Sequence, residues 1–548
     1  MENAVAEVES VLPAHISENQ RRWYAVKLLE NDSKVAESLS LSVSGKAVVE
    51  KERRTLEELH DDDMESIVTD ERYKFIQKIV STSVKKTGAK LTTSDKIDQI
   101  VTNRILGIPI FMAIMWVVYY ISVTTIGTLV TDWTNDTFVV AIQDAVGNFL
   151  SNAGASDFIL SLVVDGIIGG LGAVLGFVPQ MAILFLFLSI LEDCGYMVRI
   201  AFVMDRVFRH FGLSGKSFIP LLISSGCGIP GIMASKTIEQ DNDRRLTIMT
   251  ATFVPCGAKL PVIALMGGVM AGYVTGWDIA GMMAPIMYFV GIVAVLVAAI
   301  ILKKTKPFSG KPAPFVMELP QYHIPSARTV LLHVWERLKG FIVKAGTILF
   351  LACVVMWLLA TFGIADGHFG MVEDSADSLM AILGGAIAPV FAPLGWGEWQ
   401  PVAAAISGFS AKEGIVSTMG VLANVAGDTE DAANVATGVG MWFPTALSGF
   451  SFLMFNLLDS PCLAAISTMA QQLQSRKWFW FAILFQNIFA YMVTLCVYQI
   501  GSLILYGTFG AATVVAFIVL AFLLFMLFRP DPYKDKKMYT RSSVQAAS

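Results

Sequence analysis

The chain has 548 residues, of which 55% are hydrophobic and only 16% are charged, and its mean hydropathy is +0.61. These values exclude an ordinary soluble protein and predict a protein of the lipid bilayer. The formal net charge of −5 gives no basis for nucleic-acid binding.

The first 98 residues are densely charged, with both signs mixed, and contain no apolar segment that resembles a signal peptide. Ser17 and Gln20 form a capping-box pattern ahead of a helical segment, and further helical patterns follow. We therefore expect a small cytoplasmic helical domain over residues 1–98.

Long apolar runs dominate the rest of the chain. A helix needs about 20 apolar residues to cross a hydrocarbon core, so the sequence predicts an all-α, polytopic helical membrane protein with about eight to eleven crossings. The runs lie at residues 105–126, 178–191, 246–275, 278–302, 341–363, 440–458, 479–505 and 507–528. We expect a first membrane half over 99–302, a cytoplasmic loop over 303–340, a second membrane half over 341–530 and a cytoplasmic tail over 531–548.

Basic residues indicate the orientation. No Lys or Arg lies between Arg104 and Arg199, whereas the segments before and after that stretch are rich in them. The positive-inside rule then places both termini in the cytoplasm and the acidic stretches 126–157 and 365–378 outside. Within the loop 303–340, apolar residues over 330–338 predict a helix at the membrane surface, and an ordinary connecting helix fits that pattern equally well.

A weak internal repeat relates the two membrane halves. Residues 223–235 align with residues 406–418, and 255–258 resemble 461–464 in the same order. Duplicated, inverted halves that each contribute a discontinuous helix to a central site are typical of transporters.

The segment Gly215-Lys216-Ser217 resembles the end of a phosphate-binding loop. That motif requires a glycine at position 210, which is His210 here, and the chain has no Asn-Lys dipeptide for guanine recognition. We expect a turn between helices rather than a nucleotide site.

Three cysteines lie beside Gly or Pro breaks inside apolar sequence. Broken backbone at membrane depth is tolerated only where protein or a wet cavity covers it, so these breaks predict a site. A lone cysteine there is ordinarily a small apolar filler, but three such positions favour a metal pathway. All six cysteines lie in apolar or membrane-adjacent sequence, and we expect free thiols. The cysteines proposed as metal ligands are Cys227, Cys256 and Cys462.

Charged residues inside the spans are the second signal, because an unpaired charge in the bilayer is costly. Glu192 and Asp459 are proposed as further metal ligands. For Glu192 and its neighbour the alternative is a helix end paired with Arg199, and for Lys412 it is a structural pair with Glu413. The residues proposed for the pathway or its gate are Asp193, Gly226, Gly228, Pro230, Lys259, Ser410, Lys412 and Glu413.

Thiols together with carboxylates suit a first-row divalent ion better than Mg²⁺ or Ca²⁺, which prefer oxygen ligands. Fe²⁺, Mn²⁺, Zn²⁺ and Co²⁺ all fit. No histidine lies in an expected span, which argues against a zinc cage.

Two long segments resemble one known family. Residues 176–262, with Gly-Cys-x-x-Pro at 226–230 and Pro-Cys-x-x-Lys-Leu-Pro at 255–261, are similar to the membrane domain of ferrous iron transport protein B, as are residues 317–348. The resemblance extends over about residues 17–530. It implies two Gate repeats in the bacterial inner membrane and an Fe²⁺ transporter whose ion passes a cysteine- and carboxylate-lined pathway.

The resemblance also implies partners. The helical domain is similar to the one that follows the family's GTP-binding domain, and that GTP-binding domain has no counterpart in this sequence. We therefore expect no enzymatic activity of this chain, with GTP and Mg²⁺ bound only by a missing or separate domain that gates the pathway through the helical domain. A small accessory iron-transport protein and a homo-oligomer are further expectations.

Two alternatives differ in class. The chain could carry another solute, nucleoside-like or another divalent metal, because Gate repeats also occur in such carriers. A membrane enzyme with a cysteine nucleophile is disfavoured, because no expected span offers a histidine as its base.

Overall fold

The chain divides into two compact units, residues 1–96 and 97–548. The structure, a computed structural model, describes residues 2–13, 16–39, 41–60, 64–83, 93–103, 106–210, 215–238, 240–273, 279–308, 321–365, 368–372, 375–423 and 432–530.

The first unit is helical and has its own apolar core. Its helices are α1 (Glu2–Ser10), α2 (Glu18–Leu29), α3 (Ser33–Ser38), α4 (Val43–His60) and α5 (Met64–Ser83). Val8, Ala25 and Leu29 are fully buried in this core. Ser17 occupies the N-cap position of α2 as expected, but its hydroxyl donates to the Gln20 side chain at 3.1 Å and makes no capping bond to the backbone.

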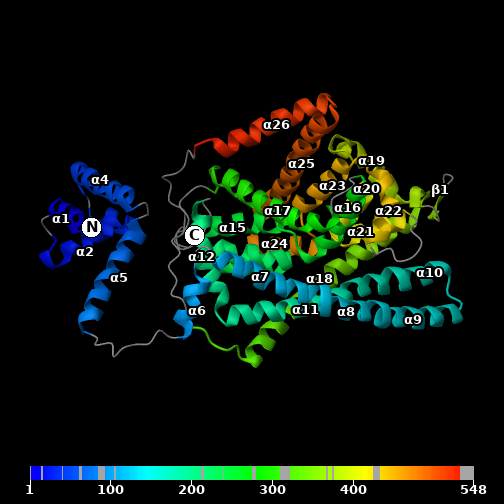
Figure 1. Ribbon diagram of the computed structural model, residues 1–548, viewed down its shortest axis with the longest axis horizontal. Helices are drawn as coiled ribbons and strands as arrows, with labels where there is room; N and C mark the ends of the chain where they lie inside the picture. Colours follow the sequence, from blue (N-terminus) through cyan, green and yellow to red (C-terminus); the bar gives the residue numbers. More distant parts are fainter. Residues whose placement is uncertain are drawn as a thin grey trace. The chain divides into compact units, whose positions relative to one another are not determined.

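The second unit begins with helix α6 (Thr93–Val101) at the boundary and continues with two long helical runs. The first run comprises α7 (Gly107–Tyr119), η1 (Tyr120–Thr125), α8 (Ile126–Asp132), η2 (Trp133–Val139) and α9 (Val140–Asn152). The second comprises α10 (Asp157–Ser161), η3 (Leu162–Gly169) and α11 (Gly170–Asp193). The two runs lie side by side (Figure 1). The acidic stretch 126–157, expected outside the membrane, is helical through residue 152.

The first repeat region is a series of short helices. It contains α12 (Tyr196–His210), η4 (Gly215–Ser217), α13 (Phe218–Gly226), α14 (Gly228–Ala234), η5 (Ser235–Thr237), α15 (Asp241–Thr250), η6 (Ala251–Phe253), η7 (Gly257–Lys259), α16 (Leu260–Ala271) and α17 (Ile279–Lys303). The turn expected at Gly215 is a 3₁₀ turn, and the Gly215 backbone N–H donates to the Asp205 carboxylate at 2.8 Å.

The second repeat region follows one continuous 35-residue helix, α18 (Ala327–Thr361). Residues 330–338 are part of α18, so the surface helix expected there is not a separate element. The region continues with β1 (Phe362–Ala365), β2 (His368–Met371), η8 (Ser375–Asp377), α19 (Leu379–Phe391), η9 (Ala392–Leu394), α20 (Trp399–Ser410), α21 (Gly414–Leu422), α22 (Ala432–Val439), η10 (Gly440–Trp442), α23 (Ala446–Leu458), α24 (Leu463–Leu473), α25 (Arg476–Tyr506) and α26 (Ala511–Phe528). Strands β1 and β2 form an antiparallel hairpin in an otherwise helical fold.

Five helices within the described residues are long and apolar enough to cross a membrane, or up to seven if each sharply bent pair is one span. Three further apolar helices in the described part of the chain, over Pro109–Ser122, Phe158–Gly172 and Phe350–Thr361, are shorter than a full span. One bent pair joins the end of α11 to α12 at 75°, and the other joins α19 to α20 at 102°. The protein is thus a helical integral membrane protein with discontinuous helices, as its sequence predicts.

Gly395 connects η9 to α20 at the sharper of these bends and offers a stability test. Its φ of +91° is a left-handed conformation, and a Cβ built there would lie 2.1 Å from the Tyr498 ring. We expect Gly395→Ala to lower the free energy of unfolding by about 2 to 4 kcal/mol, measured by denaturant unfolding in detergent. Gly385→Ala, at an exposed position of α19 with open space around it, is the control and should be neutral or stabilising by up to about 1 kcal/mol. Equal stabilities of the two variants would contradict the steric account.

Candidate functional site

Four helix breaks meet at one cavity of about 120 Å³. The first is Cys227, between α13 and α14, and the second covers residues 254–256, between η6 and η7. The third covers residues 411–413, between α20 and α21, and the fourth covers residues 459–462, between α23 and α24. Each repeat therefore contributes two interrupted helices to the same hollow.

The backbone supports the internal repeat. Cys227 has φ −152° and ψ 134°, and Ala411 has φ −149° and ψ 130°, so each interrupts its helix with one extended residue. The sequence alignment of 223–235 with 406–418 places Ser410, rather than Ala411, opposite Cys227. The extended residue of the second repeat therefore lies one position after the residue that the alignment pairs with Cys227.

Cysteine thiols from separate segments line this cavity. Cys227, Cys256 and Cys462 are all among its lining residues, as the sequence predicts for a shared site. A fourth thiol, Cys353, reaches the cavity from α18. Each of the four is partly accessible, and all six cysteines of the chain are free thiols. The cavity therefore concentrates soft, polarizable donors.

The remaining wall is mostly apolar, with a few polar groups. Gln180 and Met181 come from α11, and Ser224 and Thr252 come from the first repeat. Glu413, at the third break, is the acidic member of the lining set. Gly226 and Gly228 flank Cys227 at the wall, and the other lining residues include Leu184, Ile229, Val254, Gly257, Ala258, Lys259, Ala411, Lys412, Pro461, Ala464 and Ala465.

The donors do not form a closed chelate. Within the part of the chain that the structure describes, no three His, Cys, Asp or Glu side chains group closely enough to hold a metal ion together. The thiols are separate positions around one hollow. An ion there would complete its shell with water or with the carbonyl groups that helix breaks leave free.

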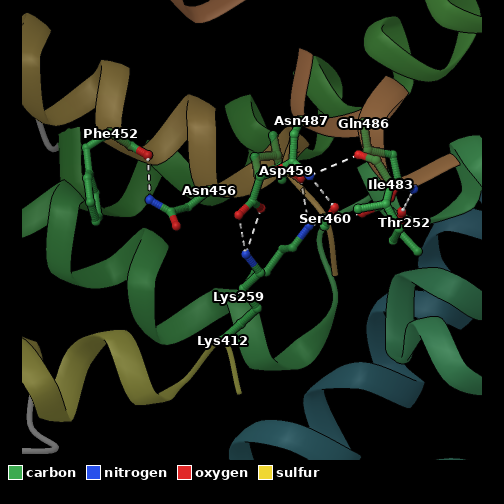
Figure 2. A network of polar contacts seen from close by, with 11 residues as sticks. Thr252, Lys259, Lys412, Phe452, Asn456, Asp459, Ser460, Ile483, Gln486 and Asn487 are labelled. Atoms are coloured by element: carbon green, nitrogen blue, oxygen red, sulfur yellow. Dashed lines mark hydrogen bonds and ion pairs between the residues drawn. The ribbon is translucent and has the colours of Figure 1, made fainter. Parts of the chain in front are cut away.

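A buried ion pair lies beside the cavity (Figure 2). The Lys412 ammonium contacts both oxygens of the Asp459 carboxylate, at 2.6 and 2.7 Å. The two side chains are 2% and 0% exposed. Lys412 therefore pairs with Asp459, 47 residues away, whereas the structural alternative expected a pair with its neighbour Glu413.

Lys259 makes a second buried contact that joins the two repeats. Its ammonium donates to the carbonyl oxygen of Thr252 at 3.0 Å and to that of Leu457, in α23, at 2.7 Å. Side chains of α25 add to the network: the Gln486 amide donates to Thr252 Oγ1 at 2.9 Å, and the Asn487 amide donates to Ser460 Oγ at 2.7 Å (Figure 2). The backbone groups freed by the breaks thus find side-chain partners, as a stable interruption requires.

The other predicted carboxylates lie outside the cavity. Glu192 is eight residues beyond Leu184, a cavity residue on the same helix, which corresponds to about 12 Å along the axis. Its carboxylate pairs with Arg337 of α18. Asp193 is the last residue of α11. The alternative pairing of Glu192 with Arg199 is not formed.

Arg199 instead pairs with Asp98 of α6, at 2.5 and 3.2 Å. The same guanidinium donates to the carbonyl oxygen of Gly195, at the bend between α11 and α12, and stacks over the Tyr322 ring at 3.7 Å. At 1% exposure, Arg199 is completely buried. It therefore ties α6, the α11–α12 bend and the segment before α18 together.

Two predicted pathway residues lie within helices and do not line the cavity. Pro230 is buried within α14, and the buried Ser410 donates to the carbonyl oxygen of Ser407 at 2.8 Å. Neither is among the cavity residues. Conversely, sequence reasoning missed Cys353, which has no break beside it, and Gln180, whose position next to Pro179 inside an apolar helix is a usable signal.

Comparison with family profiles divides the chain into three matches. Residues 1–85 match the FeoB cytosolic helical domain, and residues 284–337 match the C terminus of ferrous iron transport protein B. Residues 174–270 and 342–476 match the Gate profile, described as nucleoside recognition. The two Gate segments include all four helix breaks.

Similar curated proteins share one description. The Fe(2+) transporter FeoB of Staphylococcus aureus (strain MSSA476) is 36% identical over 495 residues, which cover 88% of this chain and 70% of the relative. The Fe(2+) transporter FeoB of Methanocaldococcus jannaschii is 35% identical over 492 residues, with the same coverage. A Porphyromonas gingivalis protein described as an Fe(2+) transport protein A/Fe(2+) transporter FeoB fusion is 32% identical and is covered over 61% of its length. No solved structure matches the chain.

Proposed function

The chain belongs to the ferrous iron transport protein B family, and from this premise we propose that it is the membrane permease part of an Fe²⁺ uptake system. The observation that carries the proposal is the cavity where four helix breaks from two repeats bring Cys227, Cys256 and Cys462 together. Thiols suit Fe²⁺ better than they suit Mg²⁺ or Ca²⁺. Interrupted helices that meet around one site are the usual construction of a transporter's binding site.

The ion pathway begins on the external side and passes the thiols. Fe²⁺ sheds part of its water in the cavity, where Cys227, Cys256 and Cys462 supply sulfur and Glu413 supplies a carboxylate. The open arrangement of these donors supports transport, because sites of moderate strength let an ion bind and still leave. Glu192, at the far end of α11, lies on the exit, where its pair with Arg337 must open or rearrange to admit the ion.

The location proposed for the protein is the bacterial inner membrane, with both termini in the cytoplasm. The support is the excess of Lys and Arg before Arg104 and after Arg529, against their absence between Arg104 and Arg199 in the sequence.

Gating is proposed to run through the helical domain. A separate GTP-binding domain would act on residues 1–96, and α6 leads directly from that unit into the contact between Asp98 and Arg199. GTP hydrolysis is proposed to take place on that GTP-binding domain. The relative described as a fusion with Fe(2+) transport protein A supports a small accessory protein as a further partner, and a homo-oligomer is also proposed.

Reconstitution tests the transport function directly. The purified chain is placed in liposomes that contain an iron-sensitive fluorophore, and Fe²⁺ is added under anaerobic, reducing conditions. We expect Fe²⁺-dependent quenching that empty liposomes do not show, together with thermal stabilisation of the protein by Fe²⁺. Stabilisation by members of a nucleoside panel, without stabilisation or uptake of Fe²⁺, would instead support a carrier of another solute, as the description of the Gate profile suggests.

The route through α6 gives a separate prediction. Asp98→Asn removes the charge opposite the buried Arg199 guanidinium, which weakens the link between α6 and the α11–α12 bend. Coupling residues of this kind typically contribute about 0.5 to 2 kcal/mol, so we expect Fe²⁺ flux per folded protein to change by a factor of about two to thirty. Lys96→Gln, an exposed change on the same helix, is the control. Flux of the Asp98 variant equal to that of the control would exclude α6 as the gating route.

A further inference from the structure

Two lysines share the cavity wall with the thiols. Lys259 and Lys412 are 5% and 2% exposed, so neither ammonium is screened by bulk water. A dication in the same cavity is repelled by each of them, and the repulsion is stronger than in water because the surroundings are apolar. A cation pathway lined by buried lysines therefore requires negative groups nearby that compensate the lysine charges.

Both ammonium groups are held at the C-terminal end of one helix, α23. Lys259 donates to the carbonyl oxygen of Leu457, and Lys412 contacts the carboxylate of Asp459, the C-cap residue of α23. The last carbonyls of a helix lack intrahelical partners, and the helix dipole makes that end negative. One lysine comes from each repeat, so the end of α23 compensates charge from both (Figure 2).

Asp459 has the geometry of a partner for Lys412 rather than of an ion ligand. Both carboxylate oxygens are engaged by the ammonium, the side chain is 0% exposed, and the residue is not among those that line the cavity. To bind an ion, Asp459 would have to abandon a buried lysine, which is costly because the lysine would then be unpaired.

We propose that Asp459 is a positioning residue that neutralises Lys412 and holds its ammonium against the end of α23, so that a dication can occupy the thiol cavity. This inference rests on the proposed Fe²⁺ transport and replaces the expected role of Asp459 as a metal ligand. Among the described residues, Asp459 thus sets one negative charge directly against the positive charge of Lys412, with both side chains buried. Loss of the Asp459 charge leaves one positive charge in excess beside the cavity.

The test compares two variants of the full chain in proteoliposomes. Asp459→Asn keeps the shape of the side chain and removes its charge, whereas the double variant Asp459→Asn with Lys412→Met removes both charges of the pair. The measurements are the Fe²⁺ concentration at half-maximal uptake and the maximal rate. A second readout that does not need transport is the Co²⁺ concentration that half-protects Cys227 from maleimide labelling.

We expect Asp459→Asn to raise the half-maximal Fe²⁺ and Co²⁺ concentrations by about tenfold or more, because the uncompensated Lys412 ammonium then repels the dication across apolar surroundings. The double variant should return both concentrations to within about threefold of the wild type, because it removes the positive charge of Lys412 together with its counter-charge. A double variant as impaired as Asp459→Asn would overturn the inference, because a lost ligand cannot be restored by removing Lys412. An unimpaired Asp459→Asn would overturn it equally.

These measurements distinguish a variant that does not fold from a wild type that does not transport Fe²⁺. Should Asp459→Asn fail to fold, the double variant, which leaves neither charge of the pair without its counter-charge, decides alone: near-wild-type half-maximal concentrations support the inference, and a large increase overturns it. If the wild type transports no Fe²⁺, the proposed function fails, whereas the Co²⁺ protection comparison still tests the role of Asp459.

Discussion

Replacing Cys227 or Cys256 by serine is expected to reduce Fe²⁺ uptake by the reconstituted protein by at least about tenfold, and the double replacement by more. Serine keeps the size of the side chain and replaces a polarizable sulfur by a hard hydroxyl oxygen, which Fe²⁺ binds less well when it competes with water. Both thiols line the shared cavity, one from each interrupted segment of the first repeat. Initial uptake rates measured against Fe²⁺ concentration check this prediction.

Cys496→Ser is the matched control. Cys496 is a free thiol in α25 that is 7% exposed and does not line the cavity, and its sulfur contacts the carbonyl oxygen of Ala516 at 3.5 Å. Its replacement should leave uptake within about twofold of the wild type, because sites without shared partners act independently. Uptake at the wild-type rate in both the Cys227 and the Cys256 variants would remove the thiol cavity from the pathway.

Lys259→Met is expected to lower the free energy of unfolding by about 2 to 4 kcal/mol, because two buried carbonyl groups lose a charged donor. One of these carbonyls belongs to Thr252 and the other to Leu457, 198 residues from Lys259, so the change also removes a direct link between the repeats. Methionine retains most of the apolar volume, which limits the cost of the cavity that is left. Unfolding of the purified protein by denaturant in detergent gives the measurement.

The control for this stability effect is Lys236→Met, at an exposed position of η5 in the same repeat. Exposed substitutions ordinarily change stability by less than about 0.5 kcal/mol. A Lys259 variant as stable as the Lys236 variant would show that the two contacts contribute nothing net to the fold.

The position of the site could be predicted from local sequence because helix interruption is a local property. Gly and Pro weaken a helix wherever they occur, so a break could be predicted at Gly226-Cys227-Gly228 and another at Pro255-Cys256. A break in the bilayer must be covered by protein or line a cavity. From these two facts it followed that the three thiols beside breaks would share a hollow, and they do.

The partners of the charged residues could not be predicted in this way. Glu192 and Arg199 are seven residues apart, about two helical turns, yet the chain bends by 75° between α11 and α12, and Arg199 pairs with Asp98, 101 residues away. Sequence proximity likewise favoured Glu413 as the partner of Lys412. The helix ends at the extended residue Ala411, however, and the Lys412 ammonium contacts the Asp459 carboxylate.

Local patterns were enough to predict a helical membrane protein with an N-terminal helical domain, two related halves and thiols at helix interruptions. These features follow from composition, hydropathy and backbone propensity, which act over a few residues. Only the tertiary structure decided which charges compensate one another, that Cys353 joins the other thiols, and that Glu192 lies away from them. Those outcomes depend on which bent and broken helices pack against one another. A buried charge pairs with an opposite group that this packing places beside it, however distant the group is along the chain.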